Sequence, residues 1–153
     1  MELKEGVHAL GSGEDERLIE VWEASVRATH DFLSESDIQY LKPLILPALR
    51  GVDKLFGVYD ESGVMAGFAG TAGGKIEALF VHPSWHRLGA GRRLVRHAVK
   101  TLGATKVDVN EQNEQAVAFY LRLGFLIEGR SDVDSMGLPF PLIHMRMDDV
   151  SKL

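Results

Sequence analysis

Two glycines, Gly89 and Gly91, flank Ala90 in the stretch HPSWHRLGAGRRLV at residues 82–95, directly before a segment with helical periodicity. The first N–H groups of a helix have no partner inside it, and the helix dipole places partial positive charge at that end. Glycine also lets an oxygen-rich ligand approach the backbone closely. The arginines that can add charge-assisted hydrogen bonds there are Arg87, Arg92 and Arg93. The stretch predicts an anion site, with a plain glycine-rich turn before a helix as the alternative.

The same stretch lacks the signatures of two common phosphate sites. No lysine followed by Ser or Thr comes after the glycines, which argues against the ATP and GTP hydrolases that use a P-loop. Position 94 is leucine rather than a third glycine, and no parallel β-α-β unit opens the chain, which argues against a dinucleotide site. We therefore expect neither class of nucleotide at this loop.

A second set of residues with regular spacing follows in VNEQNEQAVAFYLRLGF at residues 109–125. The spacing N-x-x-A-x-x-x-Y-x-x-x-G-F is formed by Asn113, Ala116, Tyr120, Gly124 and Phe125. A tyrosine hydroxyl can donate a proton in catalysis. The alternative for Tyr120 is a helix residue whose ring packs beside Phe119 and Phe125.

These residues must be positioned by a mixed α/β sheet, because the hydrophobic period changes repeatedly along the chain. Capping-box sequences at 12–15 and 34–37 predict two helix starts, although Pro43 and Pro47 limit the regularity of the second helix. Hairpin-linked central strands disfavour a purely parallel, doubly wound sheet. The predicted elements, in chain order, are a strand at 2–9, helices at about 13–28 and from 34 onward, strands at 54–59, 64–70 and 75–81 with a turn at 60–63, a helix that ends at Gly103, a strand at 105–109, a helix at 114–123, and strands near 125–130 and 141–147.

Composition and charge restrict the class of protein. The chain has 153 residues, which predicts one domain, and it has no cysteine, which removes disulfides and cysteine-based nucleophiles or metal sites. It shows neither an 18-residue apolar run nor a signal-peptide pattern, so we expect a cytoplasmic protein without a membrane partner. The net charge of -5 argues against a nucleic-acid partner. Residues 78–107 nevertheless carry no Asp or Glu, which favours an anionic ligand there, with a solvated helix face as the alternative.

The two motifs in this order resemble the GNAT superfamily of N-acetyltransferases over about residues 54–130. The acyl-CoA motif of that family, R/Q-x-x-G-x-G/A, corresponds to residues 86–91, where His86 replaces the usual arginine or glutamine. Three further segments resemble the bacterial YjaB-type subfamily: ATHDFLS at 28–34, VNEQNEQAV at 109–117 and GRSDVDSMGLPFPL at 129–142.

The resemblance implies an α/β fold with a mixed sheet, the acyl-CoA N-acyltransferase fold of about seven strands and four helices. A splayed pair of parallel strands would lie at its centre. Residues 1–153 would form a single N-acetyltransferase domain, with the CoA-binding core at about 54–130 and helices at about 13–50 beside the acceptor pocket.

The resemblance also implies where acetyl-CoA, the acyl donor, would bind. It would lie between the strands at 75–81 and 105–109, with its pyrophosphate on the loop 87–92 and its pantetheine arm paired to the strand backbone. Backbone N–H groups make most of the pyrophosphate contacts, so we expect binding to survive the replacement at His86. The implied donor-binding residues are Leu79, Phe80, Val81, His86, Arg87, Leu88, Gly89, Ala90, Gly91, Arg92, Asn113 and Tyr120.

The implied reaction is direct transfer of acetyl from the thioester to a primary amine of a small molecule, peptide or protein. A lysine amine, with a pKa of about 10.4, costs roughly 4–5 kcal/mol to deprotonate at pH 7, whereas an α-amino group costs about 1 kcal/mol. A strand N–H near Leu79 or Phe80 would stabilise the oxyanion, and Tyr120 would protonate the thiolate. Glu77 is the candidate base. Its alternative is an exposed strand residue, since its direction depends on a bulge that the sequence does not place.

Candidate acceptor contacts come from several parts of the chain. His30 and Asp31 follow the first predicted helix, and capping of that helix by His30 is the alternative. The further candidates near strand ends are Asn110, Glu111 and His144. A cationic amine is favoured by the acidic residues Asp31, Glu77, Glu111, Asp132 and Asp134.

Three further expectations concern partners and alternatives. The histidines lack the spacing of metal ligands, so we expect no metal site. We expect a monomer or homodimer. A non-catalytic acyl-CoA-binding or regulatory module with the same fold is the alternative function, against which Tyr120 and the intact motif around Asn113 argue.

Overall fold

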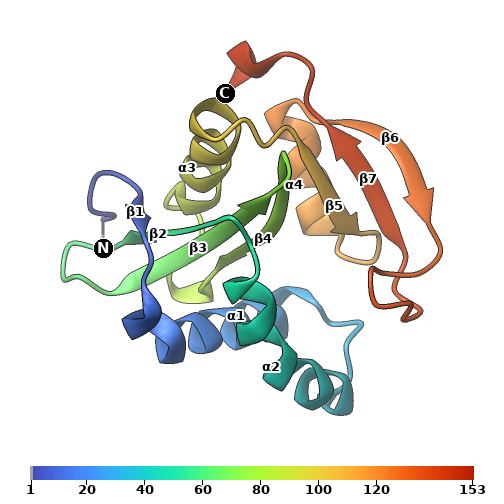
Figure 1. The fold of residues 1–153 in the computed structure, drawn as a ribbon, viewed down its shortest axis with the longest axis horizontal. Helices are drawn as coiled ribbons and strands as arrows, with labels where there is room; N and C mark the ends of the chain where they lie inside the picture. Colours follow the sequence, from blue (N-terminus) through green and yellow to red (C-terminus); the bar gives the residue numbers. More distant parts are fainter. Residues whose placement is uncertain (1) are drawn as a thin grey trace.

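The computed structural model describes residues 2–153, which form one mixed sheet with helices on both faces (Figure 1). The helices are α1 Asp15–Thr29, α2 Glu35–Arg50, α3 Ala90–Arg96 and α4 Glu114–Leu123, with short helical turns at Ser12–Glu14, Pro83–Trp85, His97–Thr101 and Val150–Lys152. The strands are β1 His8–Ala9, β2 Lys54–Tyr59, β3 Met65–Ala72, β4 Lys75–Val81, β5 Lys106–Asn110, β6 Leu126–Ser131 and β7 Leu142–Arg146. Their order is β1-β2-β3-β4-β5-β7-β6. This is the mixed α/β fold that the resemblance implies. Within residues 2–153, no helix has the length and apolar content needed to cross a membrane.

Local sequence signals account for most element boundaries. β4 and α4 begin and end where the sequence predicts. Asn113 opens α4 because its Oδ1 accepts the backbone N–H of Ala116 at 3.1 Å, and Gly124 ends the helix with a φ of 107°. The capping box of α2 is also present, with reciprocal bonds between Ser34 and Asp37 at 2.9 and 3.1 Å.

The structure corrects three expectations. The strand expected at 2–9 is reduced to β1 and an isolated bridge at Leu3, because Gly6 turns the chain with a φ of 89°. Ser12 does not cap α1, because it lies inside the short turn that precedes the helix, and no side chain caps the N-terminus of α1. α2 continues through both prolines. Ile38 near its start and Leu49 near its end are buried in the same cluster as residues of α1, and this packing anchors both ends of the helix.

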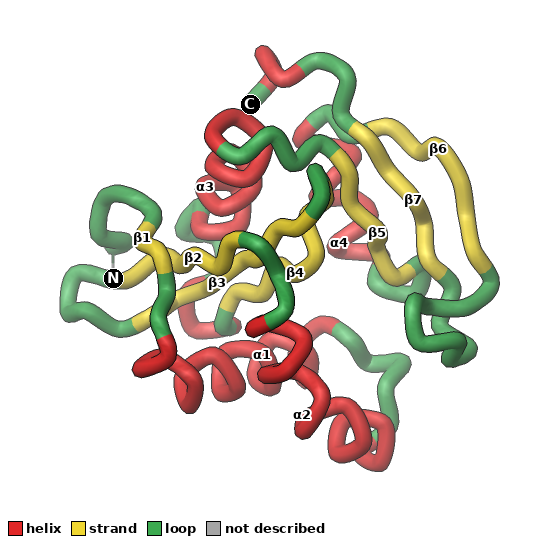
Figure 2. The backbone as a smooth tube through the Cα atoms, in the orientation of Figure 1, coloured by secondary structure: helices red, strands yellow, loops and turns green. Residues whose placement is uncertain are grey.

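Two hydrophobic cores lie on opposite faces of the sheet. α1 and α2 cover one face, where Trp22 packs in a cluster with Phe68 of β3. α3 and α4 cover the other, where Leu94 and Phe125 join Val107 of β5. Each large apolar side chain that is fully buried contributes about 1.5–3 kcal/mol to folding. The two cores therefore pack the sheet between the helix layers (Figure 2).

β4 and β5 pair over a very short distance and then separate. Their parallel register contains only the pairs Lys75–Lys106 and Ile76–Val107. On the other side of β4, the pairing with β3 shifts at Glu77, which has no opposite residue there. Such a bulge bends a strand and increases its twist. The bend leaves one edge of β4, from Glu77 onward, without pairing to β5, which is the splayed strand pair that the resemblance implies (Figure 2).

Candidate active site

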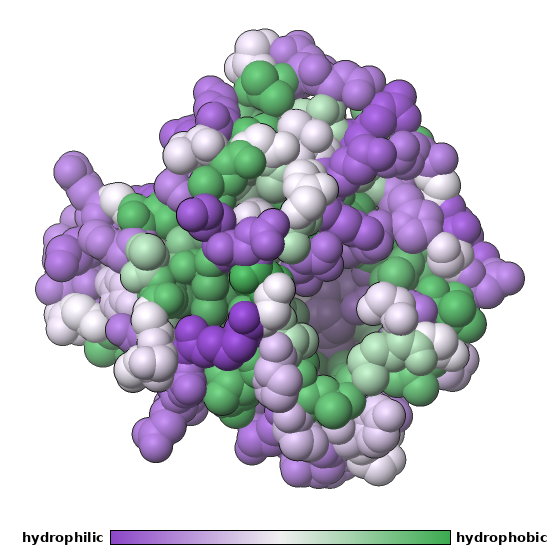
Figure 3. All heavy atoms as spheres, viewed as in Figure 1, coloured by the Kyte–Doolittle hydropathy of each residue, from purple (hydrophilic) through white to green (hydrophobic). Residues whose placement is uncertain are grey.

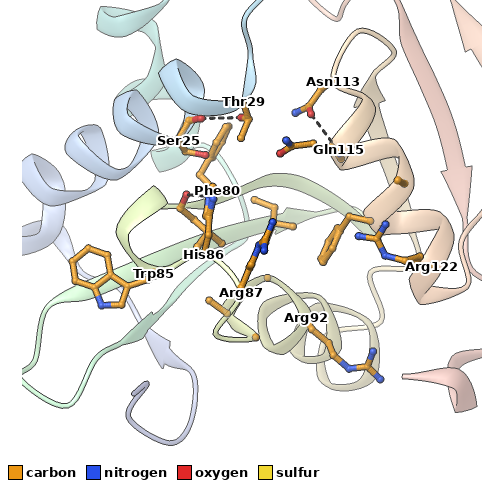
Figure 4. A pocket seen from close by; sticks show the side chains of 18 of the residues that line it. Ser25, Thr29, Phe80, Trp85, His86, Arg87, Arg92, Asn113, Gln115 and Arg122 are labelled. Atoms are coloured by element: carbon orange, nitrogen blue, oxygen red, sulfur yellow. Dashed lines mark hydrogen bonds between the residues drawn. The ribbon is translucent and has the colours of Figure 1, made fainter. Parts of the chain in front are cut away.

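A cavity of about 760 Å³ lies where β4, the loop 82–89, the first turn of α3 and one face of α4 meet, with the end of α1 at one side (Figure 4). This volume is within the range of small-molecule and cofactor sites. The predicted donor-binding residues that line it are Leu79, Phe80, Val81, His86, Arg87, Gly89, Ala90, Gly91, Arg92 and Asn113. Leu88 and Tyr120 do not line this cavity.

The loop before α3 has the backbone conformation of an anion cradle. Gly89 adopts a left-handed φ of 85° at the N-cap, and a Cβ built there meets no atom within 4 Å, so the space in front of it is open. Arg87 has a φ of 66°, which is uncommon for a non-glycine residue and costs conformational energy. A Cβ on Gly91 would come within 3.2 Å of Phe119, so α4 approaches the loop closely. Residues 89–92, at the end of α3 where the first N–H groups have no partner inside the helix, line the cavity.

The charge around this cavity is mainly positive. Arg87, Arg92 and Arg122 line it, and Glu114 is the acidic residue in the lining. Figure 4 shows that Arg87 and Arg122 come from different elements, the loop and α4. Arg93, expected here from the sequence, points elsewhere and donates to the backbone oxygen of Lys4 at 2.6 Å. The arrangement suits a polyanionic ligand.

His86, the residue that departs from the family motif, has a partner within the protein. Its Nε2 lies 3.2 Å from the backbone oxygen of Val81, the last residue of β4, and donates a hydrogen bond to it. The side chain thus fastens the loop to the end of the strand. The predicted contact of His86 with the ligand stays a prediction.

A smaller cavity of about 180 Å³ fills the split between β4 and β5. Tyr120 of α4 lines this cavity rather than the larger one and is only 5% exposed. Its ring also packs edge-on against Phe119 and Phe125, at centroid distances of 5.0 and 5.3 Å, which is the packing expected as the alternative for this residue. The role of its hydroxyl as a proton donor stays a prediction. Burial raises the pKa of Tyr120, which keeps its hydroxyl protonated.

Two carboxylates, Glu77 and Asp108, also line the smaller cavity. Glu77 is the bulged residue of β4 and is exposed, as the alternative for this residue expected. Its carboxylate makes no hydrogen bond or ion pair with the part of the chain that the structure describes. On the face of the molecule viewed in Figure 1, Figure 3 shows a hollow with a hydrophilic floor near this split. The smaller cavity thus provides negative charge, in contrast to the arginine-lined larger cavity.

Asp108 belongs to a chain of hydrogen bonds and ion pairs across four strands, β4, β5, β7 and β6. Its Oδ1 accepts a hydrogen bond from Nδ1 of His144 at 2.5 Å, and its other oxygen pairs with Lys75. Nε2 of the same histidine lies 2.6 Å from the hydroxyl of Ser131. Burial alone would raise the pKa of Asp108, but the hydrogen bonds and charges of His144 and Lys75 outweigh burial and hold that pKa below its usual value.

The predicted acceptor residues do not all come together. His30 and Asn110 line the smaller cavity, whereas Asp31, Glu111 and His144 line neither cavity. Glu111 is held by Arg130 through contacts of 2.6 and 3.1 Å, and these bonds lower its pKa.

The acidic residues expected to attract a cationic amine divide in the same way. Asp132 pairs with Arg130, and Asp134 accepts the backbone N–H groups of Met136 and Leu138. These two carboxylates therefore stabilise their own loop. Of the predicted set, Glu77 lines the smaller cavity. Asp31 lines neither cavity but directly follows His30, which lines both.

Sequence reasoning missed one whole face of α4. Its cavity-lining residues are Gln115, Ala118, Phe119 and Arg122. They are spaced i, i+3, i+4 and i+7, so the helical period was a signal that they share a face. Ser25 and Thr29 of α1 were also missed, and these lie four residues apart on the helix wall that faces α4 (Figure 4).

Comparison with known proteins gives consistent matches over most of the chain. The family model of the acetyltransferase (GNAT) domain matches residues 45–148. The peptidyl-lysine N-acetyltransferase YjaB of Salmonella typhimurium is 40% identical over 132 residues, which are 86% of this chain and 90% of that protein. The YjaB of Escherichia coli is 41% identical over 132 residues, covering 86% of this chain and 89% of its own.

Solved structures agree with these matches. The solution structure of apo YjaB from Escherichia coli superimposes with a TM-score of 0.83 at 37% identity, covering 95% of this chain and 97% of that one. The PaiA N-acetyltransferase of Thermoplasma acidophilum, in complex with coenzyme A, shares the fold with a TM-score of 0.72 at 21% identity, covering 97% of this chain and 100% of that one. The chain therefore belongs to the GNAT family of acetyltransferases, which use acetyl-CoA as acyl donor.

Proposed function

We propose that this acetyltransferase, acting as one domain over residues 1–153, modifies the side-chain amine of lysine in a peptide or protein. The observation that carries the proposal is the meeting of two cavities of opposite charge at the split between β4 and β5. His30, Leu79, Phe80, Asn113 and Ala116 line both cavities. The relatives named peptidyl-lysine N-acetyltransferases support this class of acceptor.

The larger cavity fits acetyl-CoA. The open space at Gly89, the free N–H groups of α3 and the guanidinium groups of Arg87 and Arg122 suit the phosphates. The edge of β4 that does not pair with β5 offers backbone groups to the amides of the pantetheine arm. Acetyl-CoA, when bound, supplies a thioester that an amine can attack. Residues of this chain bind and orient it and handle the protons.

The smaller cavity suits a lysine side chain. Its two carboxylates, Glu77 and Asp108, attract an ammonium group before reaction. Asp108 already pairs with two basic residues, whereas Glu77 makes no bond within residues 2–153, so Glu77 is the better proton acceptor. A base at Glu77 would offset the roughly 4–5 kcal/mol that deprotonation of a lysine amine costs at pH 7.

Tyr120 is the residue assigned to protonate the departing sulfur. It lines the smaller cavity, and its raised pKa keeps its proton on the hydroxyl until a base forms beside it. A thiolate, with a thiol pKa of about 8.5 by analogy with cysteine, is such a base.

A peptide panel tests the proposal. The protein and acetyl-CoA are incubated with a lysine peptide whose α-amine is blocked, with the same peptide carrying arginine instead, and with a lysine-free peptide whose α-amine is free. Thiol release and mass spectrometry report transfer. We expect the blocked lysine peptide to gain one acetyl group and the arginine peptide to gain none. Acetylation confined to the free α-amine, or to small amines added to the same assay, would overturn the assignment.

A further inference from the structure

His30 occupies the point at which the two cavities meet. It follows α1, its backbone N–H closes the helix on the oxygen of Val26, and its ring lines both cavities. The ring contacts Phe32, with a centroid distance of 5.3 Å, and lies beside Asn113. Capping of α1 is therefore done by the backbone of His30, and its imidazole is free for another role.

The hydrogen bonds of Thr29 determine which nitrogen of His30 carries the proton. The Thr29 hydroxyl donates its single hydrogen to the backbone oxygen of Ser25 at 2.8 Å. The same oxygen lies 2.8 Å from Nδ1 of His30 and can only accept there, so Nδ1 is the protonated nitrogen. Nε2 consequently carries no proton and can accept a hydrogen bond.

The lone pair of Nε2 has only a weak partner in the protein. Oδ1 of Asn113 accepts the N–H of Ala116, so the amide nitrogen of Asn113 faces His30. It lies 3.4 Å from Nε2, which is long for a hydrogen bond. An N–H group that enters the junction can therefore reach Nε2 without breaking a strong bond.

The imidazole is also uncharged at neutral pH. Burial lowers the pKa of His30 to about 4, and the nearby charge of Asp31 opposes this only in part. The charged groups that share the smaller cavity with it are Glu77 and Asp108. They attract the ammonium form of an amine, while a neutral imidazole accepts an N–H bond from the amine.

We propose that Nε2 of His30 accepts a hydrogen bond from the attacking amine, and that Thr29 is a positioning residue that fixes this tautomer. The inference rests on the proposed lysine acetylation. In the reaction the amine nitrogen bonds to the thioester carbonyl carbon and the carbon–sulfur bond breaks. The nitrogen gives up one proton, which goes to Glu77 or solvent, and the sulfur takes one proton. With one N–H held by His30, the nitrogen lone pair is directed away from the ring and toward the thioester.

Amide replacements separate the two ring nitrogens. The amide nitrogen of His30→Asn can reproduce the Nδ1–H bond to Thr29 but places nothing at the position of Nε2, whereas His30→Gln places an amide acceptor there. We expect kcat for the lysine peptide to fall about 100-fold in His30→Asn and much less in His30→Gln. Calorimetric affinity for acetyl-CoA and the thermal midpoint should remain near those of the wild type in both variants. Equal activity of the two variants, or a matching loss of acetyl-CoA affinity, would overturn the role of Nε2.

The role of Thr29 is tested by Thr29→Val and Thr29→Ser. Valine has no hydroxyl to accept the Nδ1–H bond, so the tautomer of His30 is no longer fixed. Thr29→Val should therefore lower kcat about tenfold with little change in KM for the peptide, and Thr29→Ser should keep kcat near the wild-type value. An active valine variant contradicts the positioning role. Wild-type protein that binds acetyl-CoA but acetylates no lysine peptide would contradict the proposed function instead, so the two failures are distinguishable.

Discussion

At the scale of single residues, Tyr120 has a structural role in packing and a proposed chemical role as proton donor. Its ring is held between Phe119 and Phe125, and its hydroxyl belongs to the wall of the smaller cavity. Because these roles use different parts of the side chain, removal of the hydroxyl separates them. Phenylalanine keeps the ring contacts and takes away the proton.

Tyr120→Phe should lower kcat by about 100-fold, because a positioned proton donor contributes on that order. The affinity for acetyl-CoA, measured by calorimetry, should stay within about twofold, since the larger cavity is unchanged. Tyr40→Phe is the matched control, because Tyr40 is 58% exposed on α2 and outside both cavities. A fully active Tyr120→Phe protein would contradict the proton-donor role.

His30 also predicts a pH dependence of stability. Its pKa is lowered from 6.5 to about 4 on folding, so the unfolded chain binds the proton more readily. Stability is therefore complete above pH 6.5 and falls as the pH drops toward 4, by about 2–3 kcal/mol between pH 7 and 4.5 from this group. Urea unfolding of wild type and His30→Gln at both pH values isolates this contribution, since all other groups are shared. An equal loss in both proteins would be inconsistent with a buried neutral His30.

At the scale of elements, the cradle and the split strands create the site together. The bulge at Glu77 bends β4 away from β5, and Gly89 then turns the chain into α3 so that its N-terminus faces the opened edge. The cradle depends on backbone conformation and open space more than on particular side chains. A side chain at Gly89 should therefore damage binding more than folding.

Gly89→Glu should weaken acetyl-CoA binding roughly 100-fold, because a carboxylate in the cradle repels the phosphates and occupies their space. Gly73→Glu is a close control. Gly73 also has a left-handed φ, of 57°, and open space around its Cβ, but it lies in the turn between β3 and β4. Calorimetry on both variants compares the same chemical change at two places. Equal affinities would show that the loop does not bind the phosphates.

The same elements show what the sequence predicts and what it leaves open. β4 and α4 have the predicted ends, because alternation, an Asn cap and a terminal glycine are local signals. The bulge at Glu77 is set by its register against β3, and the contact between His30 and Asn113 joins residues 83 apart in sequence. Both depend on tertiary structure, so no local pattern encodes them. For the same reason the pairing of His144 with Asp108 was not predicted.

At the scale of the whole molecule, charge is separated within an acidic protein. The chain has a net charge of -5, yet arginines from the loop and from α4 line the larger cavity, while carboxylates line the smaller one. We expect this separation to guide the anionic donor and the proposed cationic acceptor to different sides of one junction. The affinity for the donor should accordingly depend on ionic strength.

Arg122→Ala should weaken acetyl-CoA binding about fivefold at low salt and less at high salt, because an exposed ionic contact is screened. Arg93→Ala is the control, since that guanidinium bonds to the backbone of Lys4 outside the cavity. Calorimetry at two salt concentrations measures both effects. Wild-type affinity of Arg122→Ala for acetyl-CoA at low salt would show that Arg122 of α4 does not contact the donor.

The two cavities meet beside His30 and Leu79, and we propose that the larger one holds the donor and the smaller one the acceptor. The most direct measurement is the affinity of a single conjugate in which the sulfur of coenzyme A is joined through an acetyl spacer to the lysine nitrogen of a peptide. If the cavities adjoin as described, the conjugate should bind about 100-fold more tightly than coenzyme A alone, because both ends engage together. A conjugate that binds no better than coenzyme A would contradict the account.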